Sequence, residues 1–293
     1  MQKRHINLRD NNSIINPFLG KCSNYKCNRE FYLRKNTLFE YHRNIPASVL
    51  YNILKLWLLE EYNVTKIASK LKTFYNVEKV DSRFIYKFIH NNRILIANYL
   101  RTVYAMDPLA YKNEFQHIAI DESLFTHKEG EQVWVVGLIN AENNNIRLEI
   151  VKNRDSNTLK TIVEKYVGKG NYIISDSWSG YNFLSLPNSG YIHHVYNHGG
   201  GQFGQGLDST SRIESVWSEI KALFKKIYST IRQTNFLYFL KEIEYRRSIK
   251  SLNDIEKLAD FSQIISCVGN GISQELLKED DLMDLDYDTI FDD

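Results

Sequence analysis

The sequence is poor in the residues that build disulfide frameworks and interrupt regular structure, with 3 cysteines and 4 prolines among 293 residues. Three cysteines cannot form an even set of disulfides, so a small disulfide-stapled secreted domain is excluded. The chain also lacks a signal-peptide pattern and an apolar run of about 18 residues, which argues against a membrane-spanning helix. We therefore expect an intracellular protein with no membrane partner, in the nucleus of a eukaryote or the cytoplasm of a bacterium.

Charge is nearly balanced overall but unevenly distributed, and the formal net charge is +2. Nine of the 35 acidic residues lie from Glu275 onward, where Lys278 is the one base, which leaves 36 bases and 26 acids in the rest of the chain. Lys and Arg gain free energy by releasing counterions from DNA, so a basic body predicts a polyanion partner. A solvated charged surface is the alternative. We expect residues 275–293 to be an acidic, disordered tail.

Three acidic residues carry the strongest chemical signal: Asp121, Asp176 and Glu214, which lie 55 and then 38 positions apart. Asp121 ends the apolar run 117–120 and Asp176 ends the run 171–175, so each is expected at the end of a short buried strand. Glu214 lies near the start of a segment in which apolar residues recur at helical spacing. Those residues are Ile213, Val216, Trp217, Ile220 and Phe224.

Three carboxylates suffice for two magnesium or manganese ions, because magnesium keeps several waters and takes one or two carboxylates plus substrate phosphate. Such an ion pair activates water or a 3′-hydroxyl and stabilises the leaving oxygen of a phosphodiester. Lys221 follows Glu214 by two helical turns and is expected on the same helix face. It is therefore placed to contact a phosphate near the cut.

Residues 118–231 resemble the catalytic domain of DDE transposases of the Merlin type and related bacterial insertion-sequence transposases. The matching segments are 120–123, 175–181, 195–198 and 213–221. The resemblance implies a ribonuclease H-like α/β fold, divalent metal held by Asp121, Asp176 and Glu214, and DNA contact by Lys221. Relatives often carry Asn where this chain has Ser211, and we retain Glu214 as the third ligand because a carboxylate suits magnesium better.

Two further residues are expected to contact DNA. His198 matches an Asn-His pair of the family, and Arg212 lies two residues before Glu214. Residues 1–44 are interpreted as an irregular leader with a degenerate zinc-ribbon-like segment. Because Cys22 and Cys27 supply half of a zinc site, we expect no structural zinc.

Residues 45–105 predict a small helical domain, with helical periodicity over 46–59, 65–71 and 81–100 and caps at Thr65 and Asp81. Three helices with a short turn between the last two resemble a helix-turn-helix unit. The third helix would then present its polar side chains to DNA: Arg83, Lys87, His90, Asn91, Asn92 and Arg93. A three-helix packing with no role in DNA binding is the alternative.

Residues 112–265 are expected to form the ribonuclease H-like domain, a mixed sheet with flanking helices. A hairpin over 133–150 follows the Asp121 strand, and a helix over 158–166 leads to the Asp176 strand, which should pair in parallel with the first. We interpret the chain as a transposase that binds terminal inverted repeats and target DNA as a homodimer or larger assembly. A catalytically silent DNA-binding protein and a nuclease that cuts without joining are the alternatives.

Overall fold

The structure is a computed structural model that describes residues 19–21, 30–32, 45–60, 63–75, 80–126, 132–196, 206–227 and 235–270. The predictions for Cys22, Cys27, His198 and the acidic tail lie outside these residues. The chain divides into two compact units, Met1–Ile89 with Asn253–Lys278 and His90–Leu252 with Glu279–Asp293. In the described part of the chain, no helix is both long enough and apolar enough to cross a membrane.

The first unit is helical, as the periodicity predicts. It contains α1 (Ala47–Lys55), a π-helical continuation η1 (Leu56–Glu60), α2 (Val64–Tyr75), the first turns of α3 (Ser82–Met106) and α7 (Asp254–Asn270). The short strands β1 (Leu19–Lys21) and β2 (Glu30–Tyr32) pair in antiparallel fashion. Trp57 is fully buried and contacts Phe261 of α7 edge-to-face at 5.9 Å. This contact assigns α7 to the helical unit, whereas the sequence predicted a catalytic domain that runs to residue 265.

Helix caps in this unit are partly as expected. Asp81 Oδ1 accepts the backbone N–H of Arg83 at 2.8 Å, so Asp81 caps α3 as predicted. The prediction that Thr65 caps α2 is wrong, because the Asn63 side chain accepts the N–H groups of Thr65 and Lys66. The amide of Asn63 outcompetes the hydroxyl of Thr65 since it lies one residue ahead of the helix, where the unsatisfied N–H groups point.

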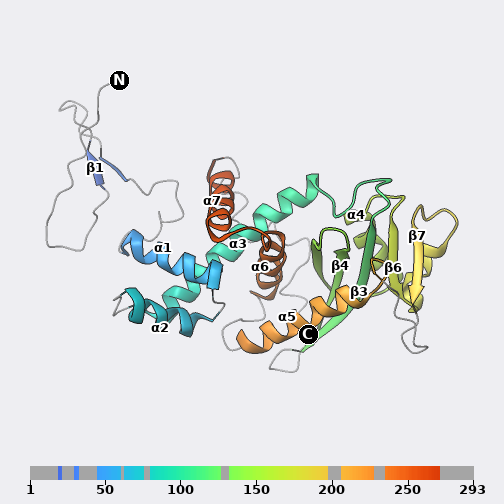
Figure 1. The fold of residues 1–293 in the computed structure, drawn as a ribbon, viewed down its shortest axis with the longest axis horizontal. Helices are drawn as coiled ribbons and strands as arrows, with labels where there is room; N and C mark the ends of the chain where they lie inside the picture. The colour runs from blue at the N-terminus through green and yellow to red at the C-terminus, as the bar shows by residue number, and fades with distance from the viewer. Residues whose placement is uncertain are drawn as a thin grey trace, which may run out of the picture. The chain divides into compact units, whose positions relative to one another are not determined.

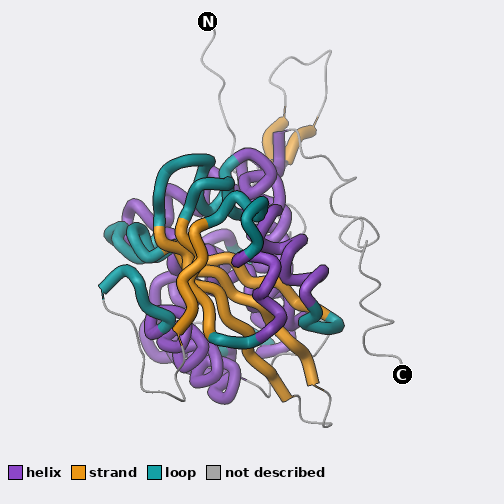
Figure 2. The backbone as a smooth tube through the Cα atoms, turned by 90° about the vertical axis from the view of Figure 1, so that its right-hand side faces the viewer, coloured by secondary structure: helices purple, strands orange, loops and turns teal. Residues whose placement is uncertain are grey.

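The second unit contains a five-stranded sheet in the order β5-β4-β3-β6-β7 (Figures 1 and 2). The strands are β3 (His117–Thr126), β4 (Gln132–Asn140), β5 (Ile146–Val151), β6 (Tyr172–Asp176) and β7 (Ile192–Tyr196). β3, β4 and β5 are antiparallel, whereas β6 and β7 run parallel to β3. This is the mixed order expected of a ribonuclease H-like fold, so that prediction is confirmed; the sequence did not predict β7 as a strand.

Helices cover both faces of this sheet. Side chains of β3 alternate between the faces. Ala119, Asp121, Ser123 and Phe125 lie on the face next to α5 (Ser211–Ile227), which we call the α5 face. Ile118, Ile120, Glu122 and Leu124 lie on the opposite face, next to α4 (Ser156–Tyr166) and the 3-10 helix η2 (Ser179–Ser185), which we call the α4 face.

Each face has its own apolar core. On the α5 face, rings of β3, α5 and α6 (Phe236–Ser248) contact one another: Phe125, Trp217, Phe224, Phe236 and Phe239. On the α4 face, buried aliphatic residues of the sheet meet Leu159 and Val163 of α4 and Tyr181 of η2. The helix around Glu214 is confirmed, since all five of its predicted apolar residues are buried.

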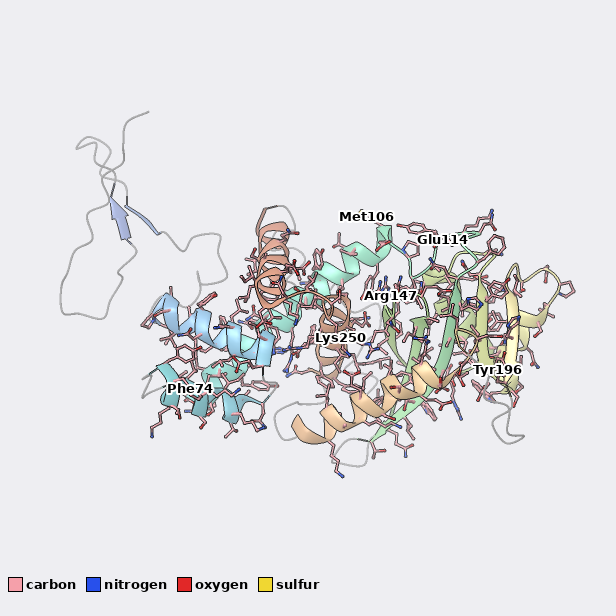
Figure 3. All side chains as sticks on the ribbon, in the orientation of Figure 1. Phe74, Met106, Glu114, Arg147, Tyr196 and Lys250 are labelled. Carbon is pink, nitrogen blue, oxygen red and sulfur yellow. The ribbon has the colours of Figure 1, made fainter. Side chains whose placement is uncertain are left out.

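Charged side chains close the outer edge of the sheet at β5. Lys241 Nζ donates to the Leu148 carbonyl and Glu244 Oε1 accepts the Leu148 N–H, each at 2.8 Å. Arg147, labelled in Figure 3, stacks on the Tyr104 ring at 3.5 Å, and Tyr104 donates to Glu244. An exposed strand edge would invite pairing with another chain, and these side chains occupy the backbone N–H and carbonyl of Leu148 on that edge.

Candidate active site

The register of β3 and β6 brings two of the three predicted carboxylates side by side. Ala119 pairs with Ile174, and Asp121 and Asp176 each lie two residues further along their parallel strands. Because side chains alternate between faces, both carboxylates lie on the α5 face. β6 ends at Asp176 as predicted, but β3 continues to Thr126, so the prediction that a strand ends at Asp121 is wrong. Pairing with β4 to the end of β3 extends the strand.

The third predicted carboxylate, Glu214, lies exposed in the first turn of α5, where its Oε1 accepts a hydrogen bond from Thr210 Oγ1 at 3.2 Å. Burial, together with the nearby charges of Asp176 and Glu214, raises the pKa of Asp121 to about 6, although hydrogen bonds from the Glu122 backbone and from Trp217 oppose the rise. Asp121 is therefore close enough to both Asp176 and Glu214 to be repelled by their charges. A divalent cation would relieve that repulsion.

Trp217 supports Asp121 from α5. Its Nε1–H donates to Asp121 Oδ2 at 3.0 Å, although the two residues are 96 positions apart. The indole ring has room because Gly137, the β4 partner of Asp121, has no side chain. A Cβ at Gly137 would lie 2.6 Å from two carbons of the Trp217 ring. Gly137 and Trp217 thus act together to fix the orientation of the Asp121 carboxylate.

Asp176 is held by the segment that follows it. Its Oδ1 accepts the Trp178 backbone N–H at 2.9 Å, which closes a tight turn after β6. The Trp178 ring folds back over Gly180, where a Cβ would lie 2.6 Å from the ring. The sequence Trp178-Ser179-Gly180-Tyr181 therefore encodes a specific turn and ring position, which sequence periodicity alone did not reveal.

Glu122 neighbours Asp121 in sequence but lies on the α4 face, as expected for a continuing strand. Tyr181 donates a hydrogen bond to Glu122 Oε1 at 2.6 Å. Burial, together with the charges of Asp121 and Asp176, raises the pKa of Glu122 to about 7, while the Tyr181 hydrogen bond and the charge of Arg154 oppose the rise. Glu122 is therefore a buried, hydrogen-bonded part of the packing on the α4 face.

The donor chemistry at this site fits a hard cation, since all three candidate ligands are carboxylates. Among the residues that the structure describes, no three His, Cys, Asp or Glu side chains are grouped closely enough to hold one ion. Magnesium is usually held by one or two protein carboxylates, with water and substrate phosphate completing the shell. The assignment of Asp121, Asp176 and Glu214 as metal ligands thus remains a prediction.

Basic residues on α5 flank the carboxylates. Lys221 is exposed, and its Nζ lies 5.8 Å from the centre of the Phe125 ring. Arg212 is half-buried and donates to the Asn144 side chain at 3.1 Å. Glu219, on the same helix, accepts a hydrogen bond from Arg247 at 2.5 Å. Lys221 therefore remains the better placed of the two predicted DNA contacts on this helix.

The residues of α3 that were predicted to contact DNA differ in their exposure to solvent. Arg83 and Lys87 are exposed, although Arg83 bonds to Asp81, and Asn91 is half-buried. Arg93 is only 3% exposed and forms an ion pair with Glu242 at 2.5 Å. The structure corrects the prediction for Arg93, because a buried and paired guanidinium is not presented to DNA. Helical spacing alone did not distinguish the packed face of this long helix from its solvated face.

Two polar clusters near the carboxylates escaped sequence reasoning. On β7, His194 Nδ1 and the Tyr196 hydroxyl both contact Asp208 Oδ2, at 2.8 and 2.5 Å; Tyr196 is labelled in Figure 3. On the α4 face, Arg154 stacks on Trp134 and Trp178. Tyr196 of the first cluster lies in the matching segment 195–198, but its contact with Asp208 was not predicted, and no pattern in the sequence pointed to the second cluster.

Comparison with known proteins identifies the sheet-containing part of the chain. Residues 108–248 match the family model of the ISXO2-like transposase domain, which confirms the resemblance to insertion-sequence transposases. No curated protein matches the chain. One similar solved structure is the cryoEM structure of the simian T-cell lymphotropic virus intasome in complex with PP2A regulatory subunit B56 gamma, at 14% identity and a TM-score of 0.35. The match covers 50% of this chain and 51% of that chain, so the chain spans about half the length of this relative.

Proposed function

We propose that the chain, whose residues 108–248 match the family model of the ISXO2-like transposase domain, cleaves DNA at the ends of a mobile element and joins the freed ends to target DNA. Asp121, Asp176 and Glu214 would hold magnesium or manganese, in two ions. The observation that carries the proposal is the parallel register of β3 and β6, which sets Asp121 level with Asp176 on one face of the sheet.

Bound ions of this kind would activate the attacking water or 3′-hydroxyl and stabilise the leaving oxygen. The protein supplies orientation and charge. Trp217 holds one oxygen of Asp121, and the Trp178 N–H holds one oxygen of Asp176, so both carboxylates keep fixed directions. Exposed Lys221 would contact a phosphate beside the cut, and Arg212 the neighbouring backbone.

DNA recognition is proposed for α3, through its exposed side chains Arg83 and Lys87 together with Asn91. His198 would contact the DNA near the cleaved phosphate. Because both ends of an element must be cut together, we expect the active form to be a homodimer or a larger assembly on DNA.

A cleavage assay tests the proposal, with DNA that carries the element ends and with magnesium or manganese. Asp121→Ala and Asp176→Ala are each expected to abolish cleavage while DNA binding persists. Retained cleavage in either variant would refute the metal assignment.

The third ligand needs a matched pair of variants on one helix. Glu214→Gln should lose cleavage, whereas Glu219→Gln, five residues later and engaged with Arg247, should retain it. The same cleavage assay on the unaltered chain separates a transposase from the two alternative functions. Nicked DNA that is never joined to target DNA indicates a nuclease. DNA that is bound but never cut indicates a catalytically silent binding protein.

A further inference from the structure

Arg154 lies in a site made by two tryptophans on the α4 face. Its guanidinium carbon is 4.1 Å from the centre of the Trp134 ring and 4.6 Å from that of Trp178. Trp134 belongs to β4, Trp178 follows β6, and Arg154 itself lies between β5 and α4. Three segments that are distant in sequence therefore converge on one planar cation, and Arg is the side chain whose plane stacks on aromatic faces.

The position of the Trp178 ring is set by the protein itself. Gly180 leaves the space that the ring occupies, since a Cβ there would lie 2.6 Å from it. The ring also meets Tyr181 edge-to-face at 6.0 Å, and buried Tyr181 is tied to Glu122 by a hydrogen bond. Both tryptophans pack against the apolar core of the α4 face. The stacking surface for Arg154 is thus built into the fold.

The Arg154 side chain is half-buried, and among the described residues its guanidinium makes no hydrogen bond or ion pair. Glu122 interacts with it through charge alone. Stacking engages the faces of the guanidinium and leaves its N–H groups for an acceptor. A guanidinium fork binds the oxygens of a phosphate with two parallel hydrogen bonds.

This cation adjoins the candidate active site. Trp178 comes two residues after Asp176, and its backbone N–H is the group that holds the Asp176 carboxylate. We propose that Arg154, stacked between Trp134 and Trp178, binds a phosphodiester group of the DNA strand beside the cleavage site. The inference rests on the proposed function, because it assigns a DNA contact to the same site. With Lys221 on α5, it would place a cation on each face of the sheet.

The test measures binding of a fluorescently labelled DNA duplex by anisotropy over a range of salt concentrations, without divalent metal. Arg154→Gln should weaken binding by about tenfold, as expected for a hydrogen bond to a charged group worth about 1.5 kcal/mol. It should also reduce the slope of log affinity against log salt by about 0.9, the value of one phosphate contact. Arg154→Lys should keep the slope but still lose affinity, because ammonium cannot stack or form the fork.

Lys160→Gln is the matched control, since Lys160 is exposed on α4 and its loss changes the net charge equally. It should leave both affinity and slope unchanged. An equal loss of affinity and slope in Lys160→Gln would show that binding depends on overall positive charge, and it would overturn the assignment of a phosphate contact to Arg154. An Arg154→Gln protein that binds like the unaltered chain would overturn it as well.

The outcome also separates this inference from the proposed function. If the unaltered chain binds DNA in an Arg154-dependent way but never cleaves it with magnesium or manganese, the Arg154 site stands and the transposase chemistry falls. If the unaltered chain cleaves DNA and Arg154→Gln binds normally, the chemistry stands and the Arg154 site falls. A chain that binds no DNA overturns both.

Discussion

Two tryptophans lie on opposite faces of the sheet at the candidate active site, and each fills space that a glycine leaves open. Trp217 lies over Gly137 on the α5 face and donates its indole N–H to Asp121. Trp178 lies over Gly180 on the α4 face and offers its ring face to Arg154. The same pairing of a large ring with a glycine thus serves a carboxylate on one face and a cation on the other.

The difference follows from what each indole presents. On the α5 face its polar N–H points at the chemistry, and on the α4 face its π-system supports a charge. Asp121 and Glu122 divide in the same way, since adjacent strand residues point to opposite faces. Both carboxyls have a raised pKa, so a perturbed pKa alone does not tell the proposed ligand from the packing residue.

The largest expected effect is on the cleavage rate, and it distinguishes Asp121 from its neighbour Glu122. Asp121→Asn should reduce magnesium-dependent cleavage by about a thousandfold or more, since metal stabilisation of the reaction is worth several kcal/mol and each 1.36 kcal/mol is tenfold. Glu122→Gln keeps an oxygen for the Tyr181 hydrogen bond and should change the cleavage rate far less. Single-turnover rates measure both, and an equal loss would remove the distinction between the two faces.

The next effect concerns pH and stability without divalent metal. The pKa of Glu122 is about 7 in the folded protein, above its ordinary value of 4.5. At low pH the group is protonated in both states. As pH rises from the ordinary value to about 7, the unfolded chain ionises first, so stability should fall by on the order of 3 kcal/mol. In Glu122→Gln, the free energy of unfolding measured with urea should differ much less between about pH 5 and about pH 8. A variant with the same pH dependence as the unaltered chain would contradict the role of burial.

A smaller effect comes from filling either glycine. Gly137→Ala and Gly180→Ala each insert a methyl group 2.6 Å from an indole ring, and such overpacking costs about 1 to 3 kcal/mol. Gly137→Ala should slow cleavage more than it weakens DNA binding, because Trp217 orients Asp121. Gly180→Ala should weaken binding, because Trp178 supports Arg154. Each variant is the control for the other. If both variants change the cleavage rate and the DNA affinity in the same way, Trp217 and Trp178 do not have separate roles.

The most conservative change is Trp217→Phe, which keeps a ring in place but removes the N–H that bonds Asp121. A hydrogen bond to a charged group contributes about 1.5 to 3 kcal/mol. The variant should therefore require more magnesium for half-maximal cleavage, while DNA binding stays unchanged. Trp134→Phe on the α4 face is the control. An unaltered magnesium requirement in Trp217→Phe would show that the indole only packs.

Local patterns in the sequence predicted the strands and the helix that carry the candidate site residues. Alternation and apolar runs located the strands that carry Asp121 and Asp176, and helical spacing located the helix of Glu214, whose apolar stripe is buried. The parallel pairing of those strands also followed from the helix between them. These features depend on the backbone geometry of each segment, which nearby residues largely determine.

Tertiary structure alone decided which side chains meet. In the folded protein β3 extends past Asp121, Arg93 is buried in an ion pair with Glu242, and α7 belongs to the helical unit. Tertiary structure also set Trp217 on Asp121 across 96 positions and placed Arg154 between two indoles. Periodicity assigns a residue to a face of its own element, but the partner on that face comes from another element, and only the packed fold brings the two within contact distance.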